Sequence, residues 1–203
     1  MGNVRTFDSA GVFEIFKQEE VQKLIDIFTN YPLNTTKHLN FVAWANGFMH
    51  LQNYKLTKNS NLLNFIPNLK VEMNNSRSDF NMPSDHSINI TSQWFIGFLE
   101  GEGSVYVFRK DYTLSISIGQ ALIDKNTIFK VAEFLNQLPS ANLFKSEDNV
   151  VKIYYSNKSI NHPRGKIELV ISQLNYIKSV VIPFFNSQQW HTKSSAFWFN
   201  LFL

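Results

Sequence analysis

The sequence predicts an α+β fold in which an apolar helix, paired strands and periodic helices follow one another in a regular order. From Ser92 onward, a capped apolar helix precedes two alternating strands, a strongly periodic helix, two or three further strands and a last helix. A shorter stretch before Ser92 is similar to the end of this series. Hydrophobic residues make up 44% of the 203 residues, which is enough for a sizeable core.

The part of the chain before Ser92 is predicted to hold one strand and two helices. Residues 11–16 alternate as a short strand, and residues 18–28 carry apolar side chains at helical spacing. Pro32 ends this helix, because proline lacks an amide donor and restricts the residue before it. A second helix is expected over 35–51, and residues 53–90 are expected to form a polar connector with short packed pieces.

The elements after Ser92 are predicted from side-chain periodicity and turn residues. Thr91 or Ser92 caps the apolar helix, and segments 104–110 and 113–120 alternate as paired strands. Asp124 caps a helix that continues to Leu138. The remaining predictions are strands over 143–147, 150–155 and 166–172, a helix over 176–185, and a shortened helix near 197–203.

Composition excludes several classes of site. The chain has no cysteine, so it forms neither a disulfide nor a thiolate metal site. Nineteen Lys and Arg against sixteen Asp and Glu give a net charge of +3, which permits binding to a polyanion without requiring it. No apolar run reaches the roughly 18–20 residues of a membrane-spanning helix, so no membrane association is expected. The abundance of Asn, Phe, Ile, Lys and Leu is typical of A·T-rich organelle coding.

The sharpest local signal is the glycine spacing within residues 95–104. Gly97 and Gly101 are four residues apart, so they share one face of the predicted helix. Glycine inside a helix costs roughly 0.5–1 kcal/mol relative to alanine. The close approach of a second backbone to the Gly97–Gly101 face would compensate this cost.

Glu102 lies between two glycines where this helix is expected to pass into a strand. A carboxylate at a helix C-terminus opposes the helix macrodipole, which is unfavourable unless a cation is present. A divalent metal suits the position, because Mg²⁺ prefers hard oxygen ligands and phosphate oxygens complete its shell. The alternative is an ordinary glycine C-cap with exposed glutamates beside it.

The run Phe-Ile-Gly-Phe-Leu-Glu-Gly-Glu-Gly at 95–103 resembles the LAGLIDADG motif of homing endonucleases of the group I intron type. The resemblance implies a repeated αββαββα unit with a four-stranded antiparallel sheet. In this family two motif helices pack side by side, and the two sheets form a saddle over DNA. Residues 92–203 are then a second repeat shortened at its C-terminus, residues 1–55 are the end of a first repeat, and 56–91 are a linker.

An internal similarity supports this division. The stretch from Leu24 to Lys37 parallels the stretch from Val181 to Lys193, with one insertion or deletion between them. The first motif helix is not in the chain, which leaves two explanations. Either the chain is a segment of a longer two-repeat reading frame, or it is a decayed or self-pairing form. We expect the first, because the similarity near Leu24 has no use in a simple homodimer.

The resemblance also implies site residues. Glu102 matches the last acid of the motif and is expected to bind Mg²⁺, and Gly97 and Gly101 are expected at the helix interface. Gln120 ends the second strand, where relatives carry a polar residue that positions water. Lys193 matches the basic residue near the scissile phosphate, with Lys37 as its counterpart in the first repeat. The alternative for either lysine is a solvated charge at a helix start.

The two strands after the motif are expected to read DNA. A two-stranded ribbon fits the major groove, where polar side chains contact base edges and cations hold phosphates. On the first strand, one face carries Ser104, Tyr106, Phe108 and Lys110. On the facing strand, the matching polar positions are Thr113, Ser115 and Ser117.

These residues predict a site-specific, metal-dependent double-strand DNA endonuclease that takes part in intron homing. The alternatives are a maturase that binds intron RNA and assists group I splicing, and an inactive remnant. The expected partners are double-stranded DNA, intron RNA in the maturase case, and a second LAGLIDADG unit from the same reading frame or another chain. The expected compartment is the mitochondrion, with the chloroplast as the second choice.

Overall fold

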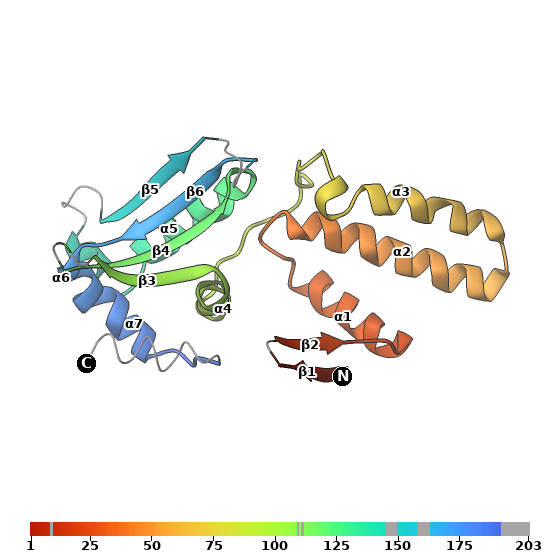
Figure 1. The fold of residues 1–203 in the computed structure, drawn as a ribbon, viewed down its shortest axis with the longest axis horizontal. Coiled ribbons are helices and arrows are strands. Elements are labelled where there is room, and N and C mark those ends of the chain that lie inside the picture. The colour runs from red at the N-terminus through yellow and green to blue at the C-terminus, as the bar shows by residue number, and fades with distance from the viewer. Residues whose placement is uncertain (9, 109, 111, 145–149, 158–162, 192–203) are drawn as a thin grey trace. The chain divides into compact units, whose positions relative to one another are not determined.

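In a computed structural model, the chain forms two compact units, Met1–His86 and Ser87–Leu203. The structure describes residues 1–8, 10–108, 110, 112–144, 150–157 and 163–191. Figure 1 shows the elements of each unit, which are described separately below.

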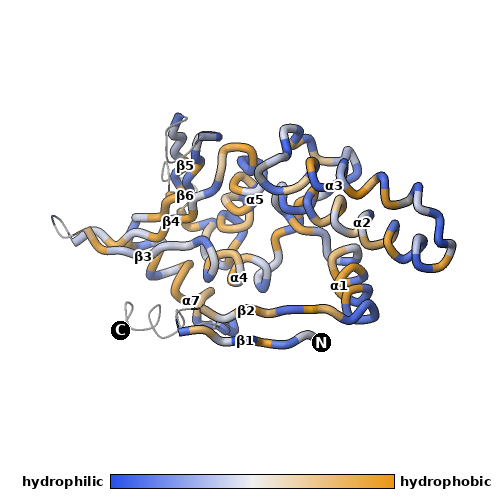
Figure 2. Tube along the Cα trace, turned by 45° about the vertical axis from the view of Figure 1, so that its right-hand side comes forward, coloured by the Kyte–Doolittle hydropathy of each residue, from blue (hydrophilic) through white to orange (hydrophobic). Residues whose placement is uncertain are grey.

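The first unit begins with a β-hairpin and continues into two helices. Strands β1 (Asn3–Phe7) and β2 (Ala10–Glu14) pair antiparallel, and helices α1 (Gln18–Asn30) and α2 (Lys37–Thr57) follow. The predicted strand and both helices are confirmed, whereas β1 was missed. Its five residues are all exposed, so neither face has to be apolar and the sequence shows no alternation. Figure 2 shows hydrophobic residues along both the hairpin and α1.

The predicted polar connector contains helical segments that pack onto α2. These are η1 (Ser60–Phe65), α3 (Ile66–Val71) and η2 (Asn74–Ser76), of which η1 and α3 contact α2. His50 of α2 stacks on Phe65 with ring centroids 5.1 Å apart. Arg77 donates from Nη2 to the Leu39 carbonyl at 3.0 Å. Residues 60–77 are therefore part of the first unit's packing.

The second unit contains one sheet with helices before, within and after it. Its strand order is β3-β4-β6-β5, and all three pairings are antiparallel. This confirms the predicted αββαββα order and the four-stranded antiparallel sheet. In chain order the elements are α4 (Ser92–Glu102), β3 (Gly103–Phe108), β4 (Thr113–Ala121), η3 (Leu122–Asp124), α5 (Lys125–Asn136), η4 (Ala141–Phe144), β5 (Val151–Ser156), β6 (Lys166–Ile171), α6 (Leu174–Tyr176), the π-helical turn η5 (Ile177–Val181) and α7 (Ile182–Asn186).

One predicted strand is wrong where the structure describes it. Residues 143 and 144 were expected to begin a strand but end η4. Ala141 is buried, and Phe144 packs edge-on against Tyr176 with centroids 5.5 Å apart. Ala141 and Phe144 are three positions apart, which is the repeat of a 3₁₀ helix, so this turn directs both side chains to the core. Residues 145–147 and the helix expected near 197–203 lie outside the described residues.

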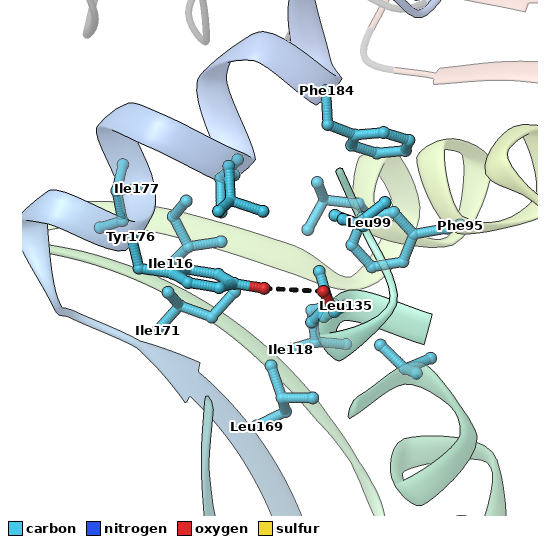
Figure 3. Packing of buried hydrophobic residues seen from close by; sticks show 14 of the residues in the cluster. Phe95, Leu99, Ile116, Ile118, Leu135, Leu169, Ile171, Tyr176, Ile177 and Phe184 are labelled. Carbon is cyan, nitrogen blue, oxygen red and sulfur yellow. Dashed lines mark hydrogen bonds between the residues drawn. The ribbon is translucent and has the colours of Figure 1, made fainter. Parts of the chain in front are cut away.

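The core of the second unit lies against one face of the sheet. Alternate residues of β4 and β6 are buried there, and helices α4, α5, η5 and α7 contribute the facing side chains, which include Phe95, Leu99, Leu135, Ile177 and Phe184 (Figure 3). Tyr176 donates its hydroxyl hydrogen to the Leu135 carbonyl at 2.8 Å. Burial raises the pKa of Tyr176 to about 12, because the phenolate would lose its hydration. Phe95 and Leu99 of α4 belong to this core, so the packing holds α4 against the sheet.

The helices of the described residues are all too short or too polar to cross a bilayer. The longest of them, α2, carries polar residues throughout its length.

Candidate nucleic-acid interface

Helix α4 brings Glu102 to the first strand of the sheet. Its N-terminus is capped by Thr91, whose Oγ1 accepts a hydrogen bond from the Trp94 amide at 3.2 Å. Phe95, Ile96 and Leu99 are buried along one side. The helix ends at Glu102, and Gly103 begins β3 directly. A Cβ at Gly103 would lie 2.5 Å from the Leu99 carbonyl oxygen, so only glycine permits this abrupt change from helix to strand.

The Glu102 carboxylate is exposed at the C-terminal end of α4. No described residue forms an ion pair or hydrogen bond with it. The negative end of the helix dipole lies at the same place, so the local potential favours a cation. Glu102 therefore suits one ligand position of a divalent metal. The described part of the chain contains no cluster of three His, Asp or Glu residues that could bind a metal by itself.

Gly97 and Gly101 form an open strip along α4. Both are exposed, and a Cβ built at either position meets no atom within 4 Å. Trp94 and Phe98 stack beside this strip with ring centroids 4.6 Å apart. The second backbone that the glycine spacing predicts is not among the described residues. The strip is thus free to receive another helix.

The sheet face opposite the core, termed the outer face, carries the predicted DNA-contacting residues of both strands. Strand register places Ser104 opposite Ser117, Tyr106 opposite Ser115 and Phe108 opposite Thr113. Directly opposed residues of an antiparallel pair project to the same side of the sheet. The prediction that these six residues share one face is therefore confirmed.

Two positions of this group differ from the prediction in exposure, and Lys110 differs in secondary structure. Ser104 and Phe108 are exposed, but Ser115 and Ser117 were expected to face solvent and are only 0% and 4% exposed. Both lie on an inner strand of the sheet, where Ser115 is paired with Tyr106 and Ser117 lies between Ser104 and Val170. The Ser115 hydroxyl has no hydrogen-bond partner among the described residues. Lys110 was predicted to continue the strand, but β3 ends at Phe108 and Lys110 lies in the following turn.

Gln120 and Glu102 lie at the same end of the sheet. Gly103 pairs with Ile118, so Gln120 lies two residues beyond this pair, where α4 ends. Gln120 pairs with the fully buried Ile167 and is half-buried itself, so it is on the core side of β4. Of the predicted lysines, Lys193 lies outside the described residues. Lys37 is the first residue of α2 in the first unit.

The structure adds outer-face residues that sequence reasoning missed. Register places Lys152, Tyr154 and Ser156 of β5 opposite Val170, Glu168 and Lys166 of β6, on the side away from the core. Tyr154 is 51% exposed, and Lys152 and Ser156 are also exposed. The strict alternation of residues 151–156 was the signal that could have identified these residues. The outer face therefore spans all four strands and carries aromatic and hydroxyl groups. Its charged residues on β5 and β6 are Lys152, Lys166 and Glu168.

Two curated proteins are similar in sequence to this chain. One is "Probable intron-encoded endonuclease Cox1-I1b" of Schizosaccharomyces pombe, 27% identical over 151 residues, or 71% of this chain and 38% of that protein. The other is "Uncharacterized mitochondrial protein RF1" of Saccharomyces cerevisiae, 24% identical over 183 residues, or 84% of this chain and 36% of that protein. The chain thus spans less than two fifths of either relative. No model of a known protein family matches it.

Solved structures of LAGLIDADG nucleases have the same fold as this chain. The homing endonuclease I-GzeII in complex with its DNA target superposes with a TM-score of 0.74 at 20% identity, covering 96% of this chain and 68% of that one. The nuclease I-SmaMI, bound to uncleaved DNA in the presence of calcium ions, superposes with a TM-score of 0.70 at 17% identity, covering 98% of this chain and 69% of that one.

Proposed function

We propose that this chain, which has the fold of the LAGLIDADG homing endonucleases, is part of a site-specific DNA endonuclease. The observation that carries the proposal is the placement of Glu102. Its carboxylate, which pairs with no described residue, ends α4 at the point where β3 begins, so a group suited to bind a metal adjoins the sheet whose outer face suits nucleic acid.

The outer face is proposed to bind double-stranded DNA through the major groove. Ser104, Phe108 and Tyr154 are exposed on it and can contact base edges or thymine methyl groups. Lys152 can contact phosphates, which position the protein without reading sequence. Ser115 and Ser117 are less suited to direct contact than the alternation indicated, because both are buried.

The proposed metal is Mg²⁺, and Glu102 is its proposed ligand from this chain. A single carboxylate leaves most of the metal's coordination shell for phosphate oxygens, water and an acid from a second unit. When bound, the ion would activate a water and stabilise charge on the leaving oxygen. Gln120 is proposed to orient the attacking water, and Lys193 to stabilise charge on the phosphate.

A second LAGLIDADG unit is the proposed occupant of the Gly97–Gly101 strip. The absence of side chains there lets another helix backbone come close, which would compensate the cost of two helical glycines. A second motif helix at this strip would bring its own terminal acid beside Glu102. The active form would therefore contain two such helices, from one longer chain or from two chains.

We further propose that the nuclease acts in intron homing in mitochondria. The support is the similarity to a yeast protein named as intron-encoded and to one named as mitochondrial. The abundance of Asn, Phe, Ile, Lys and Leu agrees with an organelle-encoded protein.

The decisive experiment incubates the protein encoded by the complete reading frame with a DNA duplex that spans the intronless junction of the host gene. Cleavage of the duplex is measured. Wild-type protein with Mg²⁺ should cut both strands. Glu102→Gln should lower the cleavage rate by about 100-fold or more while duplex binding is retained, since the ligand charge is lost and the shape is kept. Glu133→Gln is the matched control, because Glu133 is an exposed glutamate on α5 whose ion pair with Lys130 is remote from the site.

Two outcomes would contradict the proposal. Full cleavage by Glu102→Gln would show that Glu102 is not a metal ligand needed for cleavage. Absence of cleavage by the wild type, together with splicing that requires the protein and survives Glu102→Gln, would indicate the maturase function instead.

A further inference from the structure

We propose that Glu168 is a specificity-determining residue that, together with Lys166, selects a G·C base pair in the DNA target. The inference rests on the proposed function and specifies what one part of the outer face recognises.

Glu168 occupies the middle of the outer face. It lies on β6, opposite Gly119 of β4 on one side and Tyr154 of β5 on the other. Its side chain is 31% exposed, so it borders solvent without projecting freely into it. A carboxylate at this position would face bound DNA across the width of the sheet.

Gly119 makes room for the lysine that holds Glu168. Lys166 Nζ lies 3.1 Å from Glu168 Oε2. A Cβ built at Gly119 would lie 2.6 Å from Lys166 Cε and 3.2 Å from its Nζ. The lysine side chain therefore lies across Gly119, and any larger residue there would displace it. The result is a donor and an acceptor held side by side on the sheet surface.

This pair suits base reading better than phosphate binding. A carboxylate is repelled by phosphates and can only accept hydrogen bonds, so toward DNA it needs an amino group. In the major groove, cytosine presents the N4 amino donor, and the paired guanine presents the O6 and N7 acceptors. Glutamate suits the cytosine amino group and lysine suits the guanine acceptors. One G·C pair therefore offers partners to both side chains at once.

The alternative explanation is an ordinary surface ion pair, which contributes little to stability. Such a pair does not require an open glycine beside it. It also gives no reason for a carboxylate among the basic and hydroxyl groups of the outer face. The structural arrangement favours recognition.

The test measures base preference in binding. The protein encoded by the complete reading frame is incubated with Ca²⁺ and a library of duplexes that cover the intronless junction of the host gene, with each position randomised. Bound duplexes are sequenced for wild type, Glu168→Gln and the control Glu133→Gln, and each variant's thermal unfolding is recorded.

The wild type should enrich G·C at one position, and the control should give the same preferences. Glu168→Gln should lower that preference by roughly tenfold and raise A·T there, because glutamine pairs well with adenine N6 and N7. Preferences elsewhere should stay unchanged. Affinity for unrelated duplexes should rise, because a charge that repels phosphate has been removed.

Unchanged preferences in Glu168→Gln would overturn the inference and leave the proposed function intact. An equal loss of affinity for all duplexes, accompanied by a lower unfolding temperature, would show a structural role and also overturn it. If no duplex binds the wild type, the proposed DNA-binding function fails and the inference fails with it.

Discussion

The carboxylate of Glu100 accepts a hydrogen bond from the backbone amide of His191, with 3.0 Å between Oε1 and N. This bond ties the C-terminal end of α4 to a residue 91 positions later. Trp190 is anchored as well, since its Nε1 donates to the Phe185 carbonyl at 3.0 Å. The His191 backbone is therefore held at Glu100, two residues before Glu102.

We predict that Glu100→Ala releases the backbone at His191. Hydrogen exchange at the His191 amide should accelerate by roughly tenfold. A hydrogen bond to a charged group contributes about 1.5–3 kcal/mol, and an exposed one lies at the lower end of this range. Glu100→Gln retains an acceptor oxygen and should keep most of the protection. Equal exchange in wild type and Glu100→Ala would show that the hydrogen bond does not hold this segment in solution.

Gly97→Ala and Gly101→Ala should each raise the stability of the 203-residue chain. Neither new methyl group meets an atom within 4 Å, and alanine favours a helix by roughly 0.5–1 kcal/mol over glycine.

Gly97→Leu should leave the chain folded but abolish DNA cleavage by the protein of the complete reading frame, because it blocks approach of a second helix. Thermal unfolding and cleavage are the two measurements. Full cleavage with leucine at this position would argue against helix docking there.

Tyr176→Phe should lower the free energy of unfolding by about 0.5–1.5 kcal/mol, since it removes the hydroxyl donor to the Leu135 carbonyl, which keeps a second hydrogen bond from the Leu138 amide at 3.2 Å. The contribution of Tyr176 to the free energy of unfolding depends on pH. The pKa of Tyr176 is raised to about 12 in the folded state, so its contribution is complete below pH 10 and is lost as the pH rises toward 12. Urea unfolding between pH 9 and 12 should show a steeper loss in the wild type than in Tyr176→Phe.

His38 and His86 should make the first unit sensitive to acid. Their rings lie 4.5 Å apart, and burial lowers the pKa of both below 6.5. The charge of the His86 ring lowers the pKa of His38 further, while Asp85 partly opposes the shift of both histidines. A lowered folded-state pKa means that stability is complete above pH 6.5 and is lost as the pH falls through the folded-state value.

The histidine prediction is checked by thermal unfolding at pH 5 and pH 7.5. The wild type should lose more stability on acidification than His86→Phe, which keeps an aromatic ring and removes one titrating group. An identical loss in both proteins would place the acid sensitivity elsewhere in the chain.

Several features could be predicted from local sequence because their causes are local. The Thr91 cap, the apolar side of α4 and the glycine transition at Gly103 depend on residues within one or two helical turns. Strand alternation likewise assigned Ser104 and Tyr106 to one face, since neighbouring side chains of a strand project to opposite sides. These local rules were sufficient for the order of elements in the second unit.

Burial on the outer face could not be predicted in the same way. Ser115 and Ser117 have polar side chains at positions that alternate away from the core, yet both are covered. Both lie on β4, an inner strand of the sheet, whereas the exposed Ser104 lies on the edge strand β3. A serine exposed on an edge strand and one shaded on an inner strand have the same local sequence pattern.

The sequence by itself determined the order of elements in the second unit, the shared sheet face of Ser104 and Tyr106, and the position of Glu102 at a helix end. Only the tertiary structure decided that β6 lies between β4 and β5, which brings Lys166 across Gly119 to Glu168, and that Glu100 meets His191. The reason is the range of the interactions. Periodicity and capping act over a few residues, whereas strand order and cross-chain contacts depend on how distant segments bury their apolar faces together.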